Sequence, residues 1–424
     1  MNTPTLALRS HALALDDADP LKAIRHEFLR PRRADGSDVA YLCGHSLGLE
    51  PRRAVTYVNE ELEEWQRLAV EGHFNGRRPW LSYHERLTPP LARLAGALPL
   101  EVVAMNSLTV NLHLLLVSFY RPAGNRRKLL IERPAFPSDR YAAVSQILAH
   151  GLDPADALLE IGPREGEDRI REEDVMLLLD REGEAIATVL LPGVQYLTGQ
   201  RFDMQAITRA AQAKGCVVGF DLAHAIGNVP LSLHDWNVDF AVWCSYKYLN
   251  GGPGAIGGAF VHERHSRDET LPRFAGWWGH DKETRFRMGP DFQALPGAEG
   301  WQLSNPPILA MAPLLASLEI FDAAGNERRA TKATQLTGYL EFLLREKLGQ
   351  RLDILTPAAR GSQVSFRVRA PSAVLKSLHG GLQTRGFYTD LREPDVLRAT
   401  PVPLYNSYIE AWEFVAGLEA LLTA

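Results

Sequence analysis

The sequence predicts an α/β fold in which helices cover a mainly parallel sheet. Apolar runs at 187–191, 216–221 and 240–244 have the length of buried strands. A helix-forming stretch, 203–214, ends at Gly215 and separates the first two runs. Strand, helix and strand with such short joints form the right-handed parallel unit. With 424 residues, the chain is long enough for one large and one small domain.

Composition narrows the class of protein. The hydrophobic share of 46% and the charged share of 23% are ordinary for a globular protein. A net charge of −5 argues against a nucleic-acid or anionic-membrane partner. The three cysteines, Cys43, Cys216 and Cys244, show no metal-ligand spacing, and they fit a reducing cytoplasm. We find no secretory signal, and no apolar run approaches the ~20 residues that span a bilayer.

The remaining elements follow from periodicity and from residues that start or stop helices. We expect helices at Leu21–Leu29, Val55–Val70, 106–116, 136–149, 307–319 and 332–347, and strands at 128–132, 255–262 and 364–368. The helix that starts near residue 307 is expected to link the domains. The chain after it reads as a smaller α+β domain.

Lys247 and Asp221 carry the chemical prediction. Lys247 follows the 240–244 strand and precedes a Gly-Gly-Pro-Gly turn. Burial lowers the pKa of a lysine, and a neutral amine attacks a carbonyl. Asp221 ends the neighbouring strand. A lysine that binds an aldehyde as a Schiff base, facing a carboxylate that pairs with a pyridinium nitrogen and keeps it protonated, suits pyridoxal phosphate.

Other interpretations of these residues remain open at this point. A lone lysine in a glycine-rich turn is usually solvated, and an aspartate after a strand is most often a helix cap or turn former. The D-x-x-H spacing of Asp221 and His224 also allows metal ligation. No convincing third ligand lies nearby in the sequence, so no metal is expected.

Seven segments together resemble kynureninase, a fold-type I pyridoxal-phosphate enzyme of the class V aminotransferase-like superfamily. In chain order they are YLCGHSLGL, MNSLTVNLHLLL, FPSDRYA, GFDLAHAIGN, HDWNVDFAVWCSYKYLNGGPG, SNPPILA and PVPLYNS, and they extend from about residue 41 to residue 406. The resemblance implies a seven-stranded, mainly parallel sheet in a large domain (51–310) and a smaller α+β domain (311–424). Residues 1–50 would contribute to the small domain and the active site.

The resemblance also implies which residues hold the cofactor. Its phosphate would lie at the helix start near Leu108 and Thr109, and Phe136 would stack on its ring. The other cofactor-binding residues implied are Pro137, Ser138, Asp139, Asp221, His224, Tyr246, Lys247, Trp277 and Asn305. Trp277 and Asn305 would come from the neighbouring subunit, so a homodimer with active sites at the interface is expected. Pro192 stands where the family commonly has a hydroxyl residue, and any ring contact there is in doubt.

The activity implied is hydrolysis of L-kynurenine to anthranilate and L-alanine, within tryptophan catabolism and NAD biosynthesis. Lys247, Tyr246 and Asp221 would be catalytic, and a hydrogen bond from His224 would orient Asp221. The substrate would contact Ser46, His73, Ser304, Asn305 and Arg398, and the polar set around its ring would also admit 3-hydroxykynurenine.

Three alternatives to this activity stay open. The first is another fold-type I enzyme, either a cysteine desulfurase-like lyase that uses Cys43 or a class V aminotransferase. The second is a non-catalytic relative that retains the fold. The third is a metal-dependent hydrolase.

Overall fold

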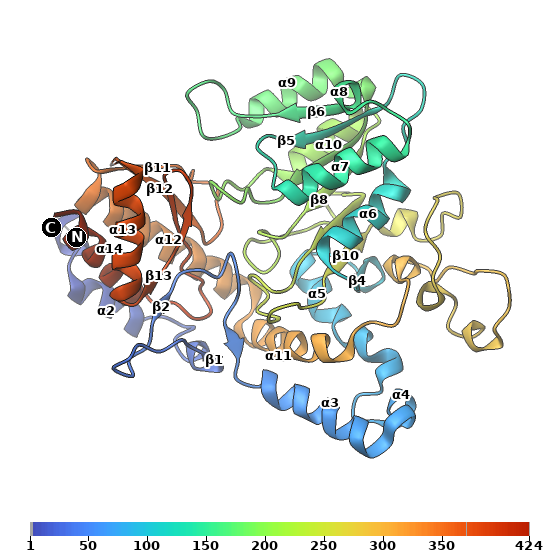
Figure 1. Cartoon of the computed structure of the whole chain (residues 1–424), viewed down its shortest axis with the longest axis horizontal. Helices are drawn as coiled ribbons and strands as arrows, with labels where there is room; N and C mark the ends of the chain where they lie inside the picture. Colours follow the sequence, from blue (N-terminus) through green and yellow to red (C-terminus); the bar gives the residue numbers. More distant parts are fainter. Residues whose placement is uncertain (1–2, 370, 424) are drawn as a thin grey trace.

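A seven-stranded sheet forms the centre of the larger of two lobes, which lie side by side in the computed structural model of residues 3–369 and 371–423 (Figure 1). Across the sheet the strands are arranged in the order β4-β10-β9-β8-β7-β5-β6. Their bounds are β4 Val102–Ala104, β5 Lys128–Glu132, β6 Leu158–Ile161, β7 Ile186–Pro192, β8 Val217–Asp221, β9 Phe240–Trp243 and β10 Gly258–Val261.

Most of the sheet is parallel. Strands β6, β5, β7, β8 and β9 pair in parallel, whereas β10 runs antiparallel to both β9 and β4. The carboxyl ends of the five parallel strands therefore meet at one edge, which is where such sheets bind ligands. The register places Asp221 beside Pro192 on one side and Val242 on the other. This arrangement confirms the predicted fold class.

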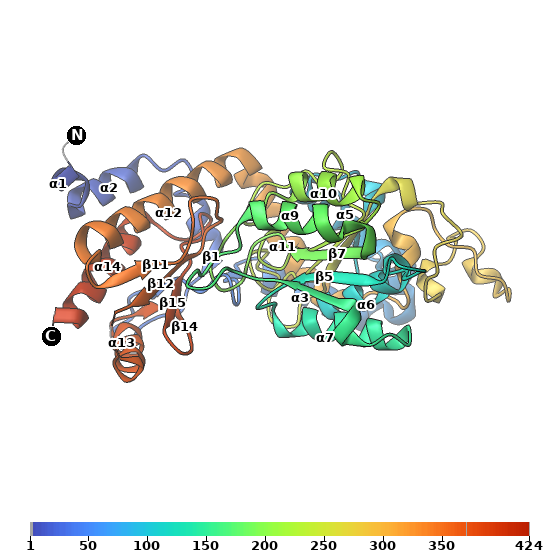
Figure 2. The same cartoon turned by 90° about the horizontal axis from the view of Figure 1, so that it is seen from above.

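Helices cover both faces of the sheet (Figure 2). In β9, Phe240 and Val242 face one core, whereas Ala241 and Trp243 face the other. The first core includes buried residues of α6 (Leu108–Phe119) and α7 (Pro137–Ala149). The second includes residues of α5 (Thr88–Ala95), α9 (Glu172–Glu182), α10 (Met204–Ala213) and α11 (Ile308–Ala324). Burial on both faces explains why these strands read as unbroken apolar runs.

The smaller lobe is a four-stranded antiparallel sheet in the order β11-β12-β15-β14. Its strands are β11 Leu352–Ile354, β12 Val364–Val368, β14 Asp390–Arg392 and β15 Val396–Ala399. Its helices are α12 Asn326–Leu348, α13 Ser372–Thr384 and α14 Tyr408–Thr423, joined by α2 Arg9–Asp17 from the other end of the chain. Both ends of the chain lie at this lobe (Figure 1).

The N-terminal segment contributes buried residues to the cores of both lobes. Ala12 and Leu42 are buried in the small-lobe core, whereas Leu21 and Phe28 are buried in the large-lobe core. The helix expected at Leu21–Leu29 is wrong: a 3₁₀ turn at Ile24–Glu27 leads into β1 (Phe28–Leu29), which pairs antiparallel with β3 (Glu50–Pro51). Strand pairing and burial of Phe28 override the local helical pattern.

Helix α11 belongs to the large lobe. It packs along α3 (Ala54–Leu68), and buried residues from Met311 to Ala324 lie in the large-lobe core. The division expected at residue 310 places this helix in the small domain, yet the separate small core begins only in α12. Among the described residues, no single helix is long and apolar enough to cross a membrane; α11 and α12 reach that length only as a pair bent by 84°.

Candidate active site

A cavity of about 220 Å³ opens at the carboxyl ends of the parallel strands. It is lined by Leu108, Thr109, Glu132, Phe136, Ser138, Asp139, Pro192, Val194, Tyr196, Asp221, Ala223, His224, Tyr246 and Lys247. These residues come from the ends of β5, β7 and β8, from the turn after β9 and from the first turns of two helices. The strand-end residues lie together because the five parallel strands end at the same edge, and the loops and helices that follow bring in the rest.

Lys247 lies in a tight turn after β9. The Asn250 N–H donates to the Lys247 carbonyl at 3.0 Å, and the Gly251 N–H donates to the Ser245 carbonyl at 2.9 Å. The Lys247 amine lies 5.7 Å from the centre of the Phe136 ring and 5.9 Å from that of Tyr246. Within the described residues no salt bridge holds it, and it lines the cavity, so the amine is available to a ligand.

Three carboxyl groups share the cavity with this single lysine. Burial raises the pKa of Glu132 to about 8. Burial and the neighbouring Asp221 raise the pKa of Asp139 well above its ordinary value. Burial also raises the pKa of Asp221, but the Ala223 N–H, which donates to it at 2.6 Å, and the charge of Lys247 oppose that rise. Asp221 is therefore the carboxyl best placed to carry the negative charge and to pair with a cationic ring nitrogen.

Two helices of ordinary length begin at the cavity. Ser107 precedes α6 and makes no side-chain capping bond, which leaves the first-turn N–H groups of Leu108 and Thr109 free for a ligand. Helix α7 begins at Pro137, with Ser138 and Asp139 in its first turn. Backbone N–H groups and the positive end of a helix favour an anion such as a phosphate.

His224 has a different environment from the one expected. Asp221 accepts its hydrogen bond from the Ala223 N–H, and no His224–Asp221 bond forms. The Nδ1 atom of His224 has no partner within the described residues. Burial and the positive charge of Lys247 lower the pKa of His224 well below its ordinary value, so the ring is neutral. The backbone of Ala223, and not the histidine ring, therefore holds the Asp221 carboxylate.

These residues fit pyridoxal phosphate. Buried Asp139 Oδ1, Glu132 Oε2 and His224 Nδ1 lack partners within the described residues, as expected of a cavity shaped for a polar ligand. Lys247 is positioned to bind an aldehyde, Asp221 to bind a pyridinium, and the two helix starts to bind a phosphate. Phe136 borders the same space and offers its ring for stacking. Pro137 starts α7 but does not line the cavity.

Arg398 and Ser46 lie just beyond the cavity wall. Arg398 is 1% exposed, and its guanidinium donates to Asp390 at 2.8 and 2.9 Å and to the Tyr196 carbonyl at 2.6 Å. The Ser46 hydroxyl lies 3.5 Å from the same Asp390 carboxylate. Tyr196 lines the cavity, so one residue separates Arg398 from it.

The other expected substrate and subunit-bridging residues lie outside the cavity lining. His73 packs against Trp80, with ring centres 5.3 Å apart. Trp277 is 40% exposed and donates to the Arg285 carbonyl at 3.1 Å. Ser304 and Asn305 are exposed in the stretch before α11. One chain alone therefore does not gather these side chains at Lys247.

Sequence reasoning missed several cavity residues: Glu132, Val194, Tyr196 and Ala223. Glu132 ends β5 as Asp221 ends β8, so the same strand-end rule would have found it. Pro192, set aside earlier, also lines the cavity. Val194 and Tyr196 carry no comparable signal, because only the fold of the loop after β7 directs them inward.

The geometry argues against two of the alternative functions, the cysteine desulfurase-like lyase and the metal-dependent hydrolase. Burial and the nearby Asp390 raise the pKa of Cys43 to about 12, which is the opposite of what a reactive desulfurase thiol needs. Two groups of possible metal ligands occur among the described residues: Glu101 with His234 and His262, and His84 with Glu85 and Glu299. Neither includes Asp221 or His224.

Comparison with known proteins adds sequence relatives. A protein-family model described as "Kynureninase C-terminal domain" matches residues 330–418. "Kynureninase" of Myxococcus xanthus is 57% identical over 425 residues, covering 99% of both chains. The protein of the same name from Koribacter versatilis is 57% identical over 414 residues, covering 97% of both, and that from Stenotrophomonas maltophilia is 55% identical over 418 residues, covering 98% of both.

Solved structures support the fold alone. A C-DES mutant with glycine covalently linked to its PLP cofactor superposes with a TM-score of 0.76 at 18% identity, covering 93% of this chain and 98% of that chain. The apo cysteine desulfurase of Thermococcus onnurineus NA1 gives 0.74 at 18% identity, covering 95% and 98%.

Proposed function

The chain belongs to the kynureninase family, and from this premise we propose that it hydrolyses L-kynurenine to anthranilate and L-alanine with pyridoxal 5′-phosphate. The observation that carries the proposal is the placement of Lys247 and Asp221 on one cavity, at the ends of neighbouring parallel strands. The two helix starts at the same cavity support the proposal, because they would bind the phosphate of this cofactor.

When bound, the cofactor supplies an aldehyde that bonds amines and a protonated pyridine ring that withdraws electrons from the substrate Cα. Lys247 would hold it covalently until the substrate amine takes that place, and the freed amine would then accept the Cα proton. Asp221 would keep the ring nitrogen protonated. Phe136 would limit the movement of the ring by packing on its face.

Carbon–carbon cleavage requires one water molecule and one further proton. The water adds to the γ-carbonyl, the Cβ–Cγ bond breaks, and Cγ leaves as the carboxylate of anthranilate. The Cβ atom then takes up a proton and becomes the methyl group of L-alanine. Burial raises the pKa of Tyr246 far above neutral, so its hydroxyl stays protonated and suits this last donation. Arg398 would bind the substrate α-carboxylate through a two-pronged contact.

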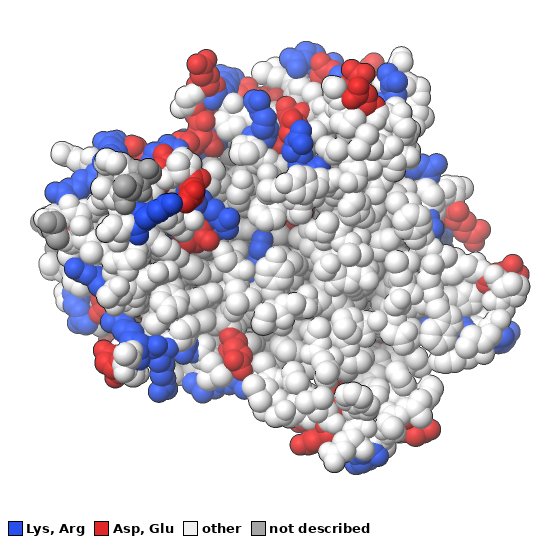
Figure 3. Space-filling model, in the orientation of Figure 1, with Lys and Arg blue, Asp and Glu red and all other residues white. Residues whose placement is uncertain are grey.

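We assign a homodimer because the single chain leaves part of the site open. Charged side chains are sparse over the middle and lower right of one face of the molecule (Figure 3). Trp65 and Val70 near the end of α3, Phe74 of α4 (Gly72–Asn75) and Met288 are all more than half exposed. Such apolar exposure is typical of a surface that another protein covers.

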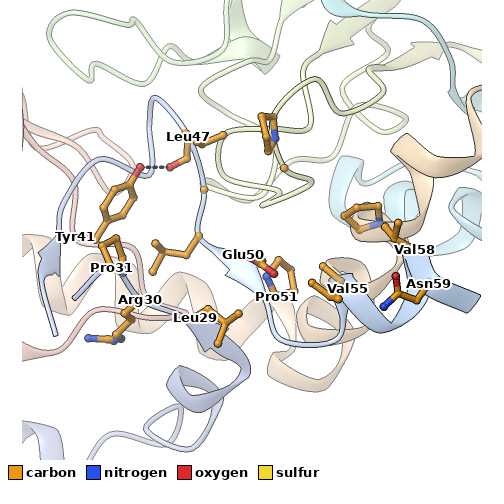
Figure 4. A pocket seen from close by; sticks show the side chains of 16 residues that line it. Leu29, Arg30, Pro31, Tyr41, Leu47, Glu50, Pro51, Val55, Val58 and Asn59 are labelled. Atoms are coloured by element: carbon orange, nitrogen blue, oxygen red, sulfur yellow. Dashed lines mark hydrogen bonds between the residues drawn. The ribbon is translucent and has the colours of Figure 1, made fainter. Parts of the chain in front are cut away.

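An apolar pocket of about 580 Å³ adds to the surface we assign to the second copy (Figure 4). Leu29, Pro51, Val55 and Val58 line it. In the dimer, Trp277 and Asn305 of the second copy would contact the cofactor phosphate. Trp65→Glu should convert the protein to a monomer in size-exclusion chromatography with light scattering, because it places a charge in the interface. An unchanged dimer mass would contradict this surface assignment.

The aryl end of the substrate would meet His73, Ser304 and Asn305, which are the polar groups that the family places there. They would also accept a 3-hydroxyl group, so 3-hydroxykynurenine is proposed as a second substrate. Comparing kcat/KM for the two compounds tests this: no turnover of the hydroxylated compound would exclude it. We place the reaction in tryptophan catabolism, in a reducing cytoplasm that suits three free thiols.

Mixing the purified, cofactor-loaded protein with L-kynurenine tests the activity directly. Anthranilate fluorescence should rise together with stoichiometric L-alanine. Amino-group transfer to a keto acid without anthranilate would instead indicate an aminotransferase. Sulfide release from L-cysteine would indicate a desulfurase.

A further inference from the structure

One short turn, residues 42–48, is bonded to both halves of the site. At one end, the Gly48 N–H donates to the Tyr246 carbonyl at 2.8 Å, directly before Lys247. At the other end, the Thr400 N–H donates to the Leu42 carbonyl at 2.8 Å, two residues after Arg398. We call residues 42–48 the connecting turn. It spans the distance between the lysine of the large lobe and the arginine of the small lobe.

The connecting turn packs closely against its neighbours at both of its glycines. A Cβ atom on Gly44 would lie 2.2 Å from the Tyr405 hydroxyl. A Cβ atom on Gly48 would lie 2.3 Å from Asn250 Oδ1 and 2.4 Å from the Lys247 carbonyl. A side chain at either position would clash with these atoms, so both glycines are required for this close packing.

His45 fixes the middle of the turn to the small lobe. Its Nδ1 atom lies 2.7 Å from the Thr400 hydroxyl, and both side chains are at most 1% exposed. Burial, together with the charges of Arg398 and Lys247, lowers the pKa of His45 well below its ordinary value, so the ring is neutral. Loss of either partner would leave a buried polar atom unpaired, which is costly in a dry environment.

We propose that His45 and Thr400 are positioning residues that set the separation between the Lys247 amine and the Arg398 guanidinium. This separation decides how well an α-amino acid can place its amine at Lys247 while its carboxylate reaches Arg398. Neither residue lines the cavity. Each acts through its neighbour, Thr400 through β15 and His45 through the connecting turn. The inference rests on the proposed function, because it assigns the substrate carboxylate to Arg398.

The test compares Thr400→Val, His45→Leu and the double variant in the cofactor-loaded protein. For each we would measure kcat and KM for L-kynurenine, the dissociation constant of L-alanine from the change in the visible spectrum, and the cofactor content. We expect KM and the L-alanine dissociation constant to rise about tenfold, with kcat within about twofold, as for the loss of one buried hydrogen bond. The double variant should be no worse than the worse single variant, because both remove the same bond.

Two further variants distinguish a positioning role from a general loss of folded structure. His45→Asn keeps an amide that can bond to the Thr400 hydroxyl, and it should recover most of the affinity that His45→Leu loses. Thr337→Val removes a hydroxyl that is also buried, in α12 of the small lobe, and it should leave KM unchanged. Thr400→Val preserves side-chain shape, so it remains informative even if His45→Leu fails to fold.

Unchanged affinity for both ligands in Thr400→Val, or a fall in kcat without a rise in KM, would overturn the inference. Absence of kynurenine turnover in the wild-type protein would defeat the proposed function instead. In that event L-alanine binding still tests the positioning role, because it requires no turnover.

Discussion

The two ends of the candidate site are built differently. The Lys247 end is assembled within one lobe, from strand ends and helix starts that share one sheet edge. The Arg398 end depends on the small lobe, and its arginine is engaged by Asp390 and the Tyr196 carbonyl. The residues expected around the substrate ring are dispersed: His73 lies in α4, whereas Ser304 and Asn305 are exposed in the loop before α11. The parallel sheet thus positions the residues expected to bind the cofactor. The residues expected to bind the substrate come from separate parts of the molecule, so substrate recognition depends on how those parts pack together.

The largest effect should come from Lys247→Ala. Without the amine, the Lys247 end loses both covalent attachment and the base, so kcat should fall by about 10⁴-fold. Borohydride reduction followed by mass spectrometry should add the cofactor mass to the wild-type chain but not to the variant. Lys376→Ala, at an exposed lysine of α13, is the matched control and should behave as wild type. Covalent cofactor in Lys247→Ala would contradict the assignment.

Asp221→Asn tests the same end with a smaller change. An amide cannot keep the pyridine nitrogen protonated, so kcat should fall by about 10²- to 10³-fold while the cofactor remains bound. Absorbance spectra and kinetics with L-kynurenine would measure both. Asp174→Asn, at a partly exposed aspartate of α9 that pairs with Arg164, is the matched control. Activity close to wild type in Asp221→Asn would assign the ring contact to Asp139 or Glu132.

Arg398→Lys tests the Arg398 end of the site. Lysine cannot make a two-pronged contact with a carboxylate, so KM should rise about 10- to 100-fold with a smaller change in kcat. The cofactor content should stay at the wild-type level, because the Lys247 end is built without Arg398. Equal losses of cofactor and of substrate affinity would show that the two ends are not separate.

The smallest effect should come from His234, a titrating residue that lies outside both the Lys247 end and the Arg398 end of the site. Glu101 is fully buried and accepts a hydrogen bond from His234 at 2.9 Å, which raises the pKa of this histidine. The charged histidine therefore stabilises the fold below its unfolded pKa of ~6.5, and that contribution is lost as pH rises through the folded pKa. His234→Asn should lower the melting temperature by about 2 °C at pH 5.5 and by less at pH 8.5. The kcat at each pH should match wild type, and a shifted pH–rate profile would connect this cluster to the site.

Much of the fold could be predicted because the buried strands are short, apolar and separated by helices with clear ends. The strand predicted at 128–132 and the helix predicted at 136–149 match β5 and α7 to within one residue. The expected Leu21–Leu29 helix failed because Phe28 and Leu29 pair with β3, a partner more than 20 residues away. Local periodicity contains no information about such a partner.

The sequence by itself determined the strand-end chemistry: an amine at Lys247, a carboxylate at Asp221, and helix starts at Leu108 and Pro137. These features are local, since each depends on a few neighbouring residues and on the rule that parallel strands end together. Only the tertiary structure decided that Glu132 and Tyr196 face the same cavity, that His224 is not bonded to Asp221, and that Asp390 holds Arg398. Those outcomes depend on strand pairing, as between Asp390 and Arg398 on β14 and β15, and on how loops pack after each strand ends, which local sequence patterns do not specify.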